Sequence, residues 1–308
     1  MDDLAKPKLA VAYSGGADST ALLIDIGRQY PKQTIAFHIH HGLQAAAGDF
    51  VRHCQNFCAE RGVPLYVAYV NAKHAVGESP EDAARGARYR ALIDLAYTHG
   101  VVESKGKVLL AQHADDQIET LLLALSRGAG LGGLSAMPSK FERGGVQFER
   151  PMLNQKAANI RARLKAAGVA FVEDPTNLDK TFTRNKIRLD VLPALQAAFP
   201  DYTATFGRSI SHMAEASDLL TQLADIDLAK IGMPPRIKDL QTLETNRQAN
   251  SIRFWLKSTY GVVPSTAQLE ELLKQIAACQ TRGHRIQIKV ASGFVSRMGE
   301  VLRYNHEL

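Results

Sequence analysis

The stretch LAVAYSGGADSTALL, residues 9–23, decides the fold of this chain. Residues 8–13 form an apolar run typical of a buried strand, and residues 17–29 have the spacing of a helix. A polar turn with two glycines, two serines and an aspartate, residues 14–19, joins them. In an open parallel sheet, ligands bind beyond the carboxyl ends of the strands. We therefore predict a ligand site at this first strand-to-helix turn.

The residue types of the turn indicate a phosphate ligand. Gly15 and Gly16 let the main chain approach a ligand closely, and the N–H groups at the helix start attract an anion. Asp18 suits a Mg²⁺ ion that is carried by phosphates. The turn lacks the endings of a Walker A loop and of the G-x-G-x-x-G fingerprint, and an ordinary capped glycine turn is the alternative. The predicted phosphate-binding residues are Ser14, Gly15, Gly16, Ala17, Asp18 and Ser19.

Strand-like and helix-like segments alternate beyond this turn. Strands are predicted at residues 33–42, 64–70 and 107–113. Helices are predicted at residues 46–61, 81–97 and 115–125. Alternating strands and helices imply right-handed crossovers between parallel strands. The predicted fold class is therefore α/β, with a doubly wound parallel sheet.

The middle of the chain is less regular. Residues 125–140 are glycine-rich and too irregular for a helix or a strand. Residues 154–168 predict a basic helix that stops at Gly168. The polar segment 173–188 reads as a loop that runs into a helix ending near Pro193.

The pattern changes after Pro200. Helices are expected at about 202–230 and 243–278, and short strands at 285–290 and 293–305. A length of 308 residues exceeds one ordinary core, so two domains are expected. We predict an α/β domain over residues 1–205. We predict a smaller, mainly helical domain over residues 206–308 that ends in short strands.

The amino-acid composition indicates the compartment of the protein and the charge of its binding partners. Apolar residues make up 45% and charged residues 22%, with three cysteines, so we expect a soluble protein of the reducing cytoplasm. We expect no signal peptide, no membrane span and no membrane partner. Residues 140–190 hold eleven lysines and arginines against six acidic residues, while the whole chain has a net charge of +6. A localised basic segment suggests a polyanion, and a solvated surface is the alternative.

The turn SGGADS resembles the SGGxDS motif of the PP-loop ATP pyrophosphatases. This resemblance implies that residues 14–19 bind ATP with Mg²⁺, and that ATP is cleaved between its α- and β-phosphates. An adenylated intermediate and pyrophosphate would result. The resemblance implies that residues 1–205 form a catalytic domain of the PP-loop ATPase type. The helical domain of residues 206–308 would then recognise the substrate.

Later motifs together resemble the tRNA(Ile)-lysidine synthetase family. They occur in order as HIHHGL (38–43), EDAARGARYRAL (81–92), AQHADDQIETLLLALSRGAGLGGLSAM (111–137), RPML (150–153) and EDPTNLDKTFTRNKIR (173–188). The resemblance is dense over residues 8–195 and looser over the later helical region. Longer family members carry a further C-terminal domain, which we expect this chain to lack or shorten.

The resemblance implies a defined reaction. ATP would adenylate the 2-oxo group of the first-anticodon cytidine of a minor isoleucine tRNA with a CAU anticodon. The ε-amine of free L-lysine would then attack that carbon, and AMP would leave. The implied partners are this tRNA and lysine, and a homodimer is an open alternative to a monomer.

A cluster of acidic residues follows the fourth predicted strand. His113, Asp115, Asp116 and Glu119 would crowd one strand-to-helix turn, with Asp115 and Glu119 one helical turn apart. They could bind Mg²⁺ or the ammonium group of lysine, and helix capping is the alternative. The predicted lysine-binding residues are Asp115, Asp116 and Glu119. The predicted catalytic residues are Asp18, Arg85, His113, Asp116 and Glu119.

Basic residues supply the remaining candidates. Arg85 could stabilise the charge of departing pyrophosphate, with Glu81 orienting it, although a surface ion-pair row is the alternative. Among His38, His40 and His41, one could approach the nucleotide, but core or exposed histidines are the favoured interpretation. The residues predicted to bind the tRNA or its base are Arg88, Asp174, Asn177, Arg184, Asn185, Arg188, Arg161, Arg163 and Lys165.

Three other functions remain open at this point. A tRNA thiolase of the same superfamily would need sulfur chemistry, but Cys54, Cys58 and Cys279 read as small buried hydrophobes. An amide-forming PP-loop synthetase would need an ammonia source, and the sequence has no recognisable glutaminase segment. A non-catalytic RNA-binding protein is disfavoured by the intact Ser14, Asp18, Asp116 and Glu119.

Overall fold

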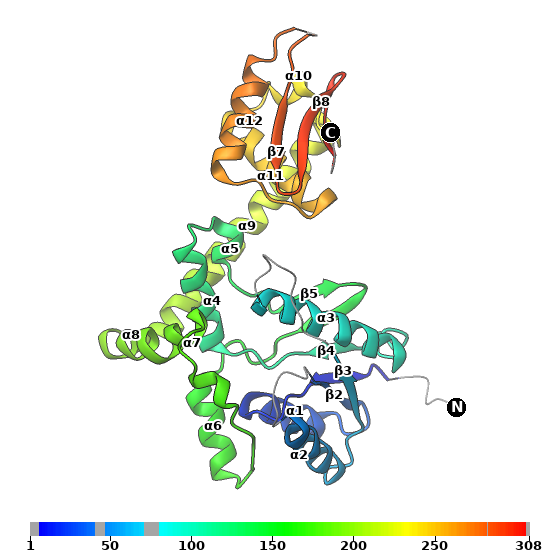
Figure 1. Ribbon diagram of the computed structural model, residues 1–308, viewed down its shortest axis with the longest axis vertical. Helices are drawn as coiled ribbons and strands as arrows, with labels where there is room; N and C mark the ends of the chain where they lie inside the picture. The colour runs from blue at the N-terminus through cyan, green and yellow to red at the C-terminus, as the bar shows by residue number, and fades with distance from the viewer. Residues whose placement is uncertain (1–5, 41–46, 71–79, 282, 306–308) are drawn as a thin grey trace. The chain divides into compact units, whose positions relative to one another are not determined.

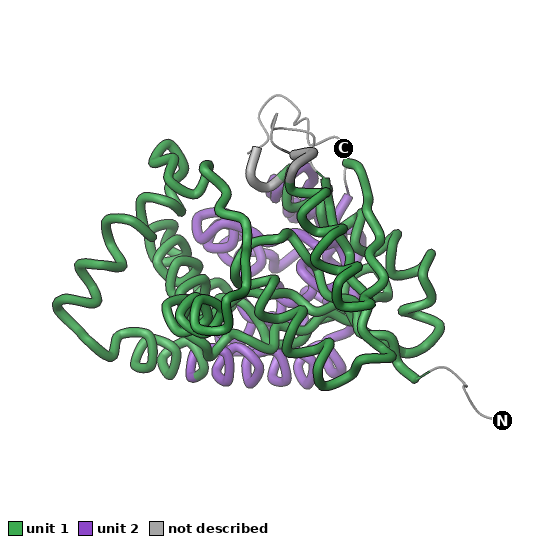
Figure 2. Tube along the Cα trace, turned by 90° about the horizontal axis from the view of Figure 1, so that it is seen from below, with its two compact units in different colours: residues 1–211 green, residues 212–308 purple. Residues whose placement is uncertain are grey.

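A computed structural model describes residues 6–40, 47–70, 80–281 and 283–305. The chain divides into two compact units, Met1–Ser211 and His212–Leu308 (Figure 2). Among the described residues, no helix combines the length and the apolar character needed to cross a bilayer. The predicted division of labour between residues 1–205 and 206–308 stays a prediction.

The first unit is built on one six-stranded sheet (Figure 1). The strands lie in the order β3-β2-β1-β4-β6-β5, and every pairing is parallel except that of β5 with β6. The predicted mostly parallel α/β fold is therefore confirmed. The strand bounds are Leu9–Ala12 for β1, Thr34–His40 for β2, Leu65–Tyr69 for β3, Lys107–Leu109 for β4, Lys140–Arg143 for β5 and Val146–Glu149 for β6.

Helices cover both faces of this sheet. Val11 of β1 packs in one core with Leu22 and Cys54, whereas its neighbour Ala10 packs in another with Leu92. This alternation follows from the two-residue period of a strand. Strand β1 is thus buried on both faces, which explains its continuous apolar run. The covering helices are α1 (Ala17–Gln29), α2 (Ala47–Ala59), α3 (Pro80–Thr98) and α6 (Ala157–Ala166), while α4 (Ala114–Ser126) follows β4 and packs against η2 and α5.

The β5–β6 hairpin was not among the predicted elements. Its two strands have four residues each and carry charged side chains, so they lack the apolar signal of the central strands. Gly144 and Gly145 join them with φ values of 56° and 73°, a conformation that suits glycine pairs in tight hairpins. The Gly-Gly pair is the sequence signal that could have revealed the hairpin.

The structure of residues 125–198 differs from the predicted elements in two places. The glycine-rich stretch contains a short helix, α5 (Leu131–Leu134). The helix expected to end near Pro193 instead continues as α8 (Leu192–Ala198). Pro193 is the second residue of α8. Before it come a 3₁₀ helix, η1 (Pro175–Leu178), then α7 (Thr183–Lys186) and a π-helical turn, η2 (Ile187–Val191).

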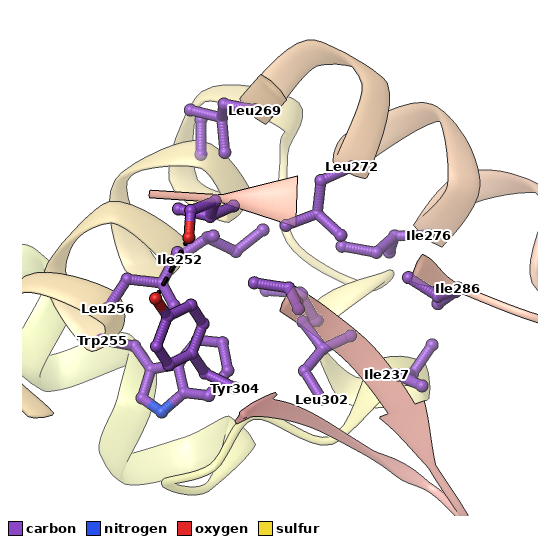
Figure 3. Packing of buried hydrophobic residues seen from close by; sticks show 14 of the residues in the cluster. Ile237, Ile252, Trp255, Leu256, Leu269, Leu272, Ile276, Ile286, Leu302 and Tyr304 are labelled. Atoms are coloured by element: carbon purple, nitrogen blue, oxygen red, sulfur yellow. Dashed lines mark hydrogen bonds between the residues drawn. The ribbon is translucent and has the colours of Figure 1, made fainter. Parts of the chain in front are cut away.

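The second unit has its own core of helices and a small sheet (Figure 3). Trp255, Ile252 and Leu272 pack with Val295 and Tyr304 of an antiparallel β7-β8-β9 sheet. Helix α9 (Tyr202–Ile231) contains the boundary between the units. The other elements are α10 (Ile237–Leu240), α11 (Thr245–Tyr260), α12 (Thr266–Ala278), β7 (Gln287–Val290), β8 (Gly293–Met298) and β9 (Val301–Asn305).

Candidate active site

The turn between β1 and α1 is held by its two serines. The Ser14 main-chain N–H donates to Ser19 Oγ at 3.2 Å, and the two hydroxyl oxygens lie 3.1 Å apart. Gly15 has a φ of 84°, and a Cβ there would meet Cys54 Sγ at 3.1 Å. Only glycine fits this position without strain. The sequence therefore folds locally into a fixed, open turn.

The start of α1 presents main-chain donors to this turn. Gly16 is the N-cap and has no side chain with which to satisfy the first N–H groups of the helix. Such N–H groups, together with the helix dipole, favour an anion at the helix start. The main chain of residue 172 closes the other side, because Val172 N–H donates to the Gly15 carbonyl at 2.9 Å. The arrangement can hold a phosphate group.

Asp18 lies in the first turn of α1 and is only partly satisfied. Its Oδ2 lies 3.6 Å from His113 Nε2, while its buried Oδ1 has no hydrogen-bond partner. Burial raises the pKa of this carboxyl, but His113, Arg161 and Arg188 outweigh burial, so the net pKa is lowered. An ionised oxygen without a partner suits a bound cation. Among the described residues, no group of three histidine, cysteine or acidic side chains could hold a metal by itself.

His113 connects the phosphate turn with the start of α4. Its main-chain N–H donates to Asp116 Oδ2 at 3.0 Å, and Asp116 N–H donates back to His113 Nδ1 at 3.4 Å. This capping box leaves Nε2 facing Asp18 and Asp116. Burial lowers the pKa of His113, but the hydrogen bond to Asp18 and the charges of Asp116 and Asp115 raise it overall. The imidazole thus links two carboxylates.

Asp115 accepts hydrogen bonds from the starts of two other helices. Its Oδ2 accepts a hydrogen bond from Ala157 N–H at 2.8 Å, at the start of α6. Its Oδ1 accepts from the Tyr202 hydroxyl at 3.3 Å. Burial first, and then Asp115, raises the pKa of Tyr202 to about 12, so this hydroxyl remains a donor. Asp115 therefore ties together the starts of α4, α6 and α9.

Glu119 is completely buried beneath two arginines. Its Oε2 accepts from Arg184 Nε at 2.7 Å, and its Oε1 accepts from Arg188 Nε at 2.7 Å. Arg188 Nη2 also reaches Asp116 Oδ1 at 3.3 Å. Burial lowers the pKa of Arg188, but Glu119, Asp116 and Asp18 raise it overall. The structure thus brings the predicted carboxylates and two predicted tRNA-binding arginines into one network.

The remaining residues of segment 173–188 shape its loop. Asp174 Oδ1 accepts from Thr176 N–H at 2.9 Å and caps η1. Asn185 Nδ2 donates at 2.8 Å to the carbonyls of both Thr176 and Asp179. Asn177 is exposed on the same loop. These contacts fix the backbone that carries Arg184 and Arg188, and the predicted roles of these residues in tRNA binding stay predictions.

The other basic candidates lie on exposed helix faces. Arg85 and Arg88 project from α3, and the Arg85 guanidinium lies 6.0 Å from the centroid of the Tyr89 ring. The Glu81 side chain lies outside the described residues. Arg161, Arg163 and Lys165 are exposed on α6, with buried Ile160 and Leu164 on its other side.

Two residues of the basic helix α6 reach toward α1. Arg163 Nη2 pairs with Asp25 Oδ2 at 2.8 Å. The charge of Arg161 contributes to the lowered pKa of Asp18. The basic helix therefore lies close enough to the phosphate turn to influence it electrostatically.

The histidines of β2 differ in environment. His38 is buried, and its Nδ1 lies 2.9 Å from the Tyr13 carbonyl oxygen. Burial is the main cause that lowers its pKa. The His40 ring centroid lies 5.0 Å from that of Tyr69. His41 lies outside the described residues. His38 therefore has the satisfied contacts of a core histidine.

The three cysteines are buried thiols. Burial raises the pKa of Cys54 to about 12 and that of Cys58 to about 11. Both pack in the core between the sheet and α1. Cys279 lies in the second unit, where its Sγ is 3.2 Å from Arg297 Nη1. The thiols of Cys54 and Cys58 therefore stay protonated, and protonated, buried thiols are poor nucleophiles and poor metal ligands.

Sequence reasoning missed three residues that border the site. Tyr202 carries no motif signal, and its contact with Asp115 joins residues far apart in sequence. Gln117 clamps Met137 through two hydrogen bonds, with its Nε2 donating to the carbonyl at 2.9 Å and its Oε1 accepting from the N–H at 2.8 Å. Arg150 opens the RPML motif at residues 150–153, and the sequence there gives no signal of a role for this residue.

Comparisons with known proteins agree with this arrangement. Residues 1–195 match the PP-loop domain family, and residues 236–308 match the TilS substrate binding domain. The chain is 58% identical over 297 residues to the tRNA(Ile)-lysidine synthase of Polaromonas naphthalenivorans, which covers 96% of this chain and 89% of that protein. It is 43% identical over 264 residues to the enzyme of that name from Pseudomonas aeruginosa, covering 80% of this chain and 58% of the relative.

A solved structure shares the fold at much lower identity. The U34-tRNA thiolase NcsA from Methanococcus maripaludis, determined with its [4Fe-4S] cluster, superposes with a TM-score of 0.58 at 16% identity. The match covers 70% of this chain and 74% of the thiolase, and it shows the fold alone. The two domain matches and the long alignments at 58% and 43% identity decide the family. This chain belongs to the tRNA(Ile)-lysidine synthase family.

Proposed function

We propose that this protein is an AMP-forming ligase that joins lysine to the 2-position of the first-anticodon cytidine in a minor isoleucine tRNA. The observation that carries the proposal is that one histidine, His113, lies between the phosphate turn and the carboxylate cluster. His113 Nε2 lies 3.6 Å from Asp18 in the phosphate turn and 3.4 Å from Asp116 in the carboxylate cluster. A nucleotide and a cationic substrate could therefore meet across His113.

The nucleotide half of the reaction uses the β1–α1 turn. Ser14, Ser19 and the free N–H groups at the start of α1 would bind the phosphates of ATP. Asp18 would hold a Mg²⁺ ion through its partnerless Oδ1, with phosphate oxygens as further ligands. When bound, that ion would neutralise charge on the pyrophosphate. Arg85 would stabilise the same developing charge from α3.

The lysine half uses the carboxylates of α4. Asp115, Asp116 and Glu119 provide negative charge for the substrate ammonium group. The ε-amine must lose a proton before its lone pair can attack C2 of the adenylated cytidine, and Asp116 would accept that proton. The new C–N bond forms as the C2–O bond to AMP breaks. His113 holds Asp116 in position through the capping box.

The segment proposed to contact tRNA adjoins the carboxylates directly. Arg184 and Arg188 bind Glu119, so this segment would border the proposed lysine site. Arg88, Asp174, Asn177 and Asn185 would contribute to the same surface. Arg161, Arg163 and Lys165 would contact tRNA phosphates, because they are cationic and exposed on α6.

The setting of the reaction is also part of the proposal. The partners are free L-lysine and the tRNA with a CAU anticodon, and the compartment is the cytoplasm. A homodimer is the alternative to a monomer, and light scattering of the purified protein decides between them.

One assay tests the proposed function against its rivals. The protein is incubated with ATP, Mg²⁺, labelled lysine and an unmodified transcript of the minor isoleucine tRNA. We expect AMP formation that requires both lysine and tRNA, with the label transferred to the transcript. Controls replace the anticodon CAU by GAU, or replace lysine by ornithine, ammonium or a sulfur donor. Sulfur-dependent or ammonium-dependent AMP formation would favour the thiolase or amide synthetase, and tRNA binding without turnover would favour a non-catalytic protein.

A further inference from the structure

Arg150 is a charged side chain buried just after β6. Only 4% of its surface is exposed. Its guanidinium donates to Gln112 Oε1 at 3.0 Å, to the Pro138 carbonyl at 2.6 Å and to the Tyr89 hydroxyl at 3.2 Å. The guanidinium carbon also lies 4.3 Å from the centroid of the Phe141 ring. One side chain thus contacts three segments of the chain, namely α3, the turn before α4 and residues 138–141.

The partners of Arg150 are neutral. Within the ranges that the structure describes, no carboxylate lies within ion-pair distance of this guanidinium, whereas Arg184 and Arg188 each reach two. Burial lowers the pKa of Arg150, which means that the charged form is disfavoured there. A buried charge without an ionic partner is costly. Such a side chain therefore needs a reason beyond packing.

The segments joined by Arg150 carry groups of the proposed reaction. Tyr89 follows Arg85 by one turn of α3. Gln112 immediately precedes His113. Pro138 follows Met137, which Gln117 of α4 clamps by two hydrogen bonds. Arg150 is thus a bridge between the helix that carries the pyrophosphate-stabilising arginine and the turn that carries the carboxylates.

We propose that Arg150 is a positioning residue, whose planar guanidinium fixes the distance between Arg85 on α3 and the His113 turn. This inference rests on the proposed function. The fork of an arginine can bond three acceptors in fixed directions, which the single ammonium of lysine cannot reproduce. Loosening the bridge misplaces Arg85 relative to the phosphates, and small misplacements of such groups slow the chemical step.

The test compares variants that separate shape from charge. In Arg150→Lys the charge remains but the fork is removed, and in Arg150→Met both are removed. We expect kcat for AMP formation to fall by about tenfold to a hundredfold in both, because both variants lose the orientation that the guanidinium fork imposes. The KM for lysine and the affinity for tRNA should change less than about twofold, because the residues that bind them are unchanged. The matched control is Arg143→Gln, since Arg143 lies 4.7 Å from the same Tyr89 ring but is exposed.

Chemical rescue of kcat by a small cation distinguishes a positioning role from a purely structural one. Millimolar guanidinium should restore part of kcat to Arg150→Ala, whereas ammonium at the same concentration should not. Thermal unfolding shows whether each variant is folded. Should the Arg150 variants fail to fold, Tyr89→Phe removes one acceptor and keeps the ring, and kcat should fall several-fold.

The outcomes separate this inference from the proposed function. A wild-type protein without lysine-dependent AMP formation rejects the function itself. An active wild type together with full kcat in folded Arg150→Lys overturns the positioning role alone. If the Arg150 variants do not fold and Tyr89→Phe keeps full kcat, Arg150 serves stability only. A loss of kcat in Arg143→Gln equal to that in Arg150→Met would also contradict the specific bridge.

Discussion

Each of the two units buries an acidic side chain completely, but the surroundings differ. In the second unit Asp227 is 0% exposed, and Arg247 of α11 binds both of its oxygens, with Nε at 3.0 Å from Oδ2. That group is complete, with one carboxylate and one guanidinium. In the first unit Glu119 is equally buried, but its neighbours include Asp116, and nearby Asp18 keeps an oxygen without a partner.

The difference indicates what each cluster is for. A buried carboxylate whose two oxygens are both paired with one partly exposed guanidinium needs nothing further, so Asp227 and Arg247 serve the fold of their unit. A cluster with more carboxylates than it needs, next to an unsatisfied oxygen, keeps capacity for a cation. Removing one charge from the Glu119 cluster should therefore lower turnover, whereas removing one charge from the Asp227 pair should lower the stability of its unit.

The largest effect is expected at the phosphate turn. Asp18→Ala and Ser14→Ala should each reduce lysine-dependent AMP formation on the order of a hundredfold or more, because they remove groups aimed at the phosphates. Circular dichroism and thermal unfolding check that the variants are folded. Asp25→Asn is the matched control, since Asp25 lies on the same helix but is only half-buried and is paired with Arg163. Near-normal AMP release from folded Asp18→Ala would reject its role.

The second prediction compares the two buried carboxylates directly. Glu119→Gln should lower turnover by about tenfold or more while the second unit keeps its stability, because the change affects the proposed lysine site. Asp227→Asn should lower the unfolding temperature by several degrees, since it leaves Arg247 without its charged partner, but turnover per folded molecule should remain. Calorimetry and the AMP assay are run on both variants. Equal losses of turnover in the two would remove the distinction between the clusters.

A smaller effect is expected on the basic face of α6. Changing Arg163 and Lys165 to glutamine should weaken tRNA binding several-fold and flatten its salt dependence, by about 0.7 to 0.9 in log–log slope for each phosphate that is no longer neutralised. Arg161 is left intact, because its charge acts on Asp18. ATP affinity should stay constant and is titrated in parallel. An unchanged salt slope would show that this face is only solvated and would direct the search to residues 191–308.

The smallest effect is expected from the thiols. Replacing Cys54, Cys58 and Cys279 together by alanine should leave AMP formation per folded molecule unchanged, since attack by an amine needs no thiol. Loss of chemistry with intact folding and ATP binding would favour sulfur transfer.

The pKa values of the thiols also predict a pH effect on wild-type stability. Cys54 and Cys58 have folded pKa values of about 12 and about 11, above the value of about 8.5 for an unfolded thiol. Above about pH 8.5 the unfolded chain releases protons that the folded chain keeps, so stability should fall as pH rises. Denaturant titrations of wild type and the triple variant from neutral to alkaline pH measure this difference. An equal decline in both proteins would assign the effect to other groups.

The sequence predicted local features better than distant contacts. The phosphate turn lies within six consecutive residues, and α1 has the predicted bounds, because apolar spacing and glycines act locally. The pairing of Glu119 with Arg184 joins residues 65 positions apart, and no periodicity encodes it. Motif resemblance placed both residues near substrates without predicting their contact.

Other features escaped prediction for physical reasons of their own. The β5–β6 hairpin has short, charged strands, so its pairing depends on a glycine turn rather than on apolar alternation. Arg150 reads as one more surface cation in the basic segment, yet the fold buries it among neutral acceptors. Burial of a charge is a property of the assembled core, and a single sequence does not reveal it.

The hairpin also affects how partly folded chains behave in a crowded cell. Strand β5 forms one edge of the sheet, and three of its four residues, Lys140, Glu142 and Arg143, are charged and exposed. Charged edge strands discourage pairing with strands of other molecules. The opposite edge is β3, whose sequence LYVAY has no charge. We therefore expect that aggregation of this protein, when it occurs, begins at β3 rather than at the β5 edge.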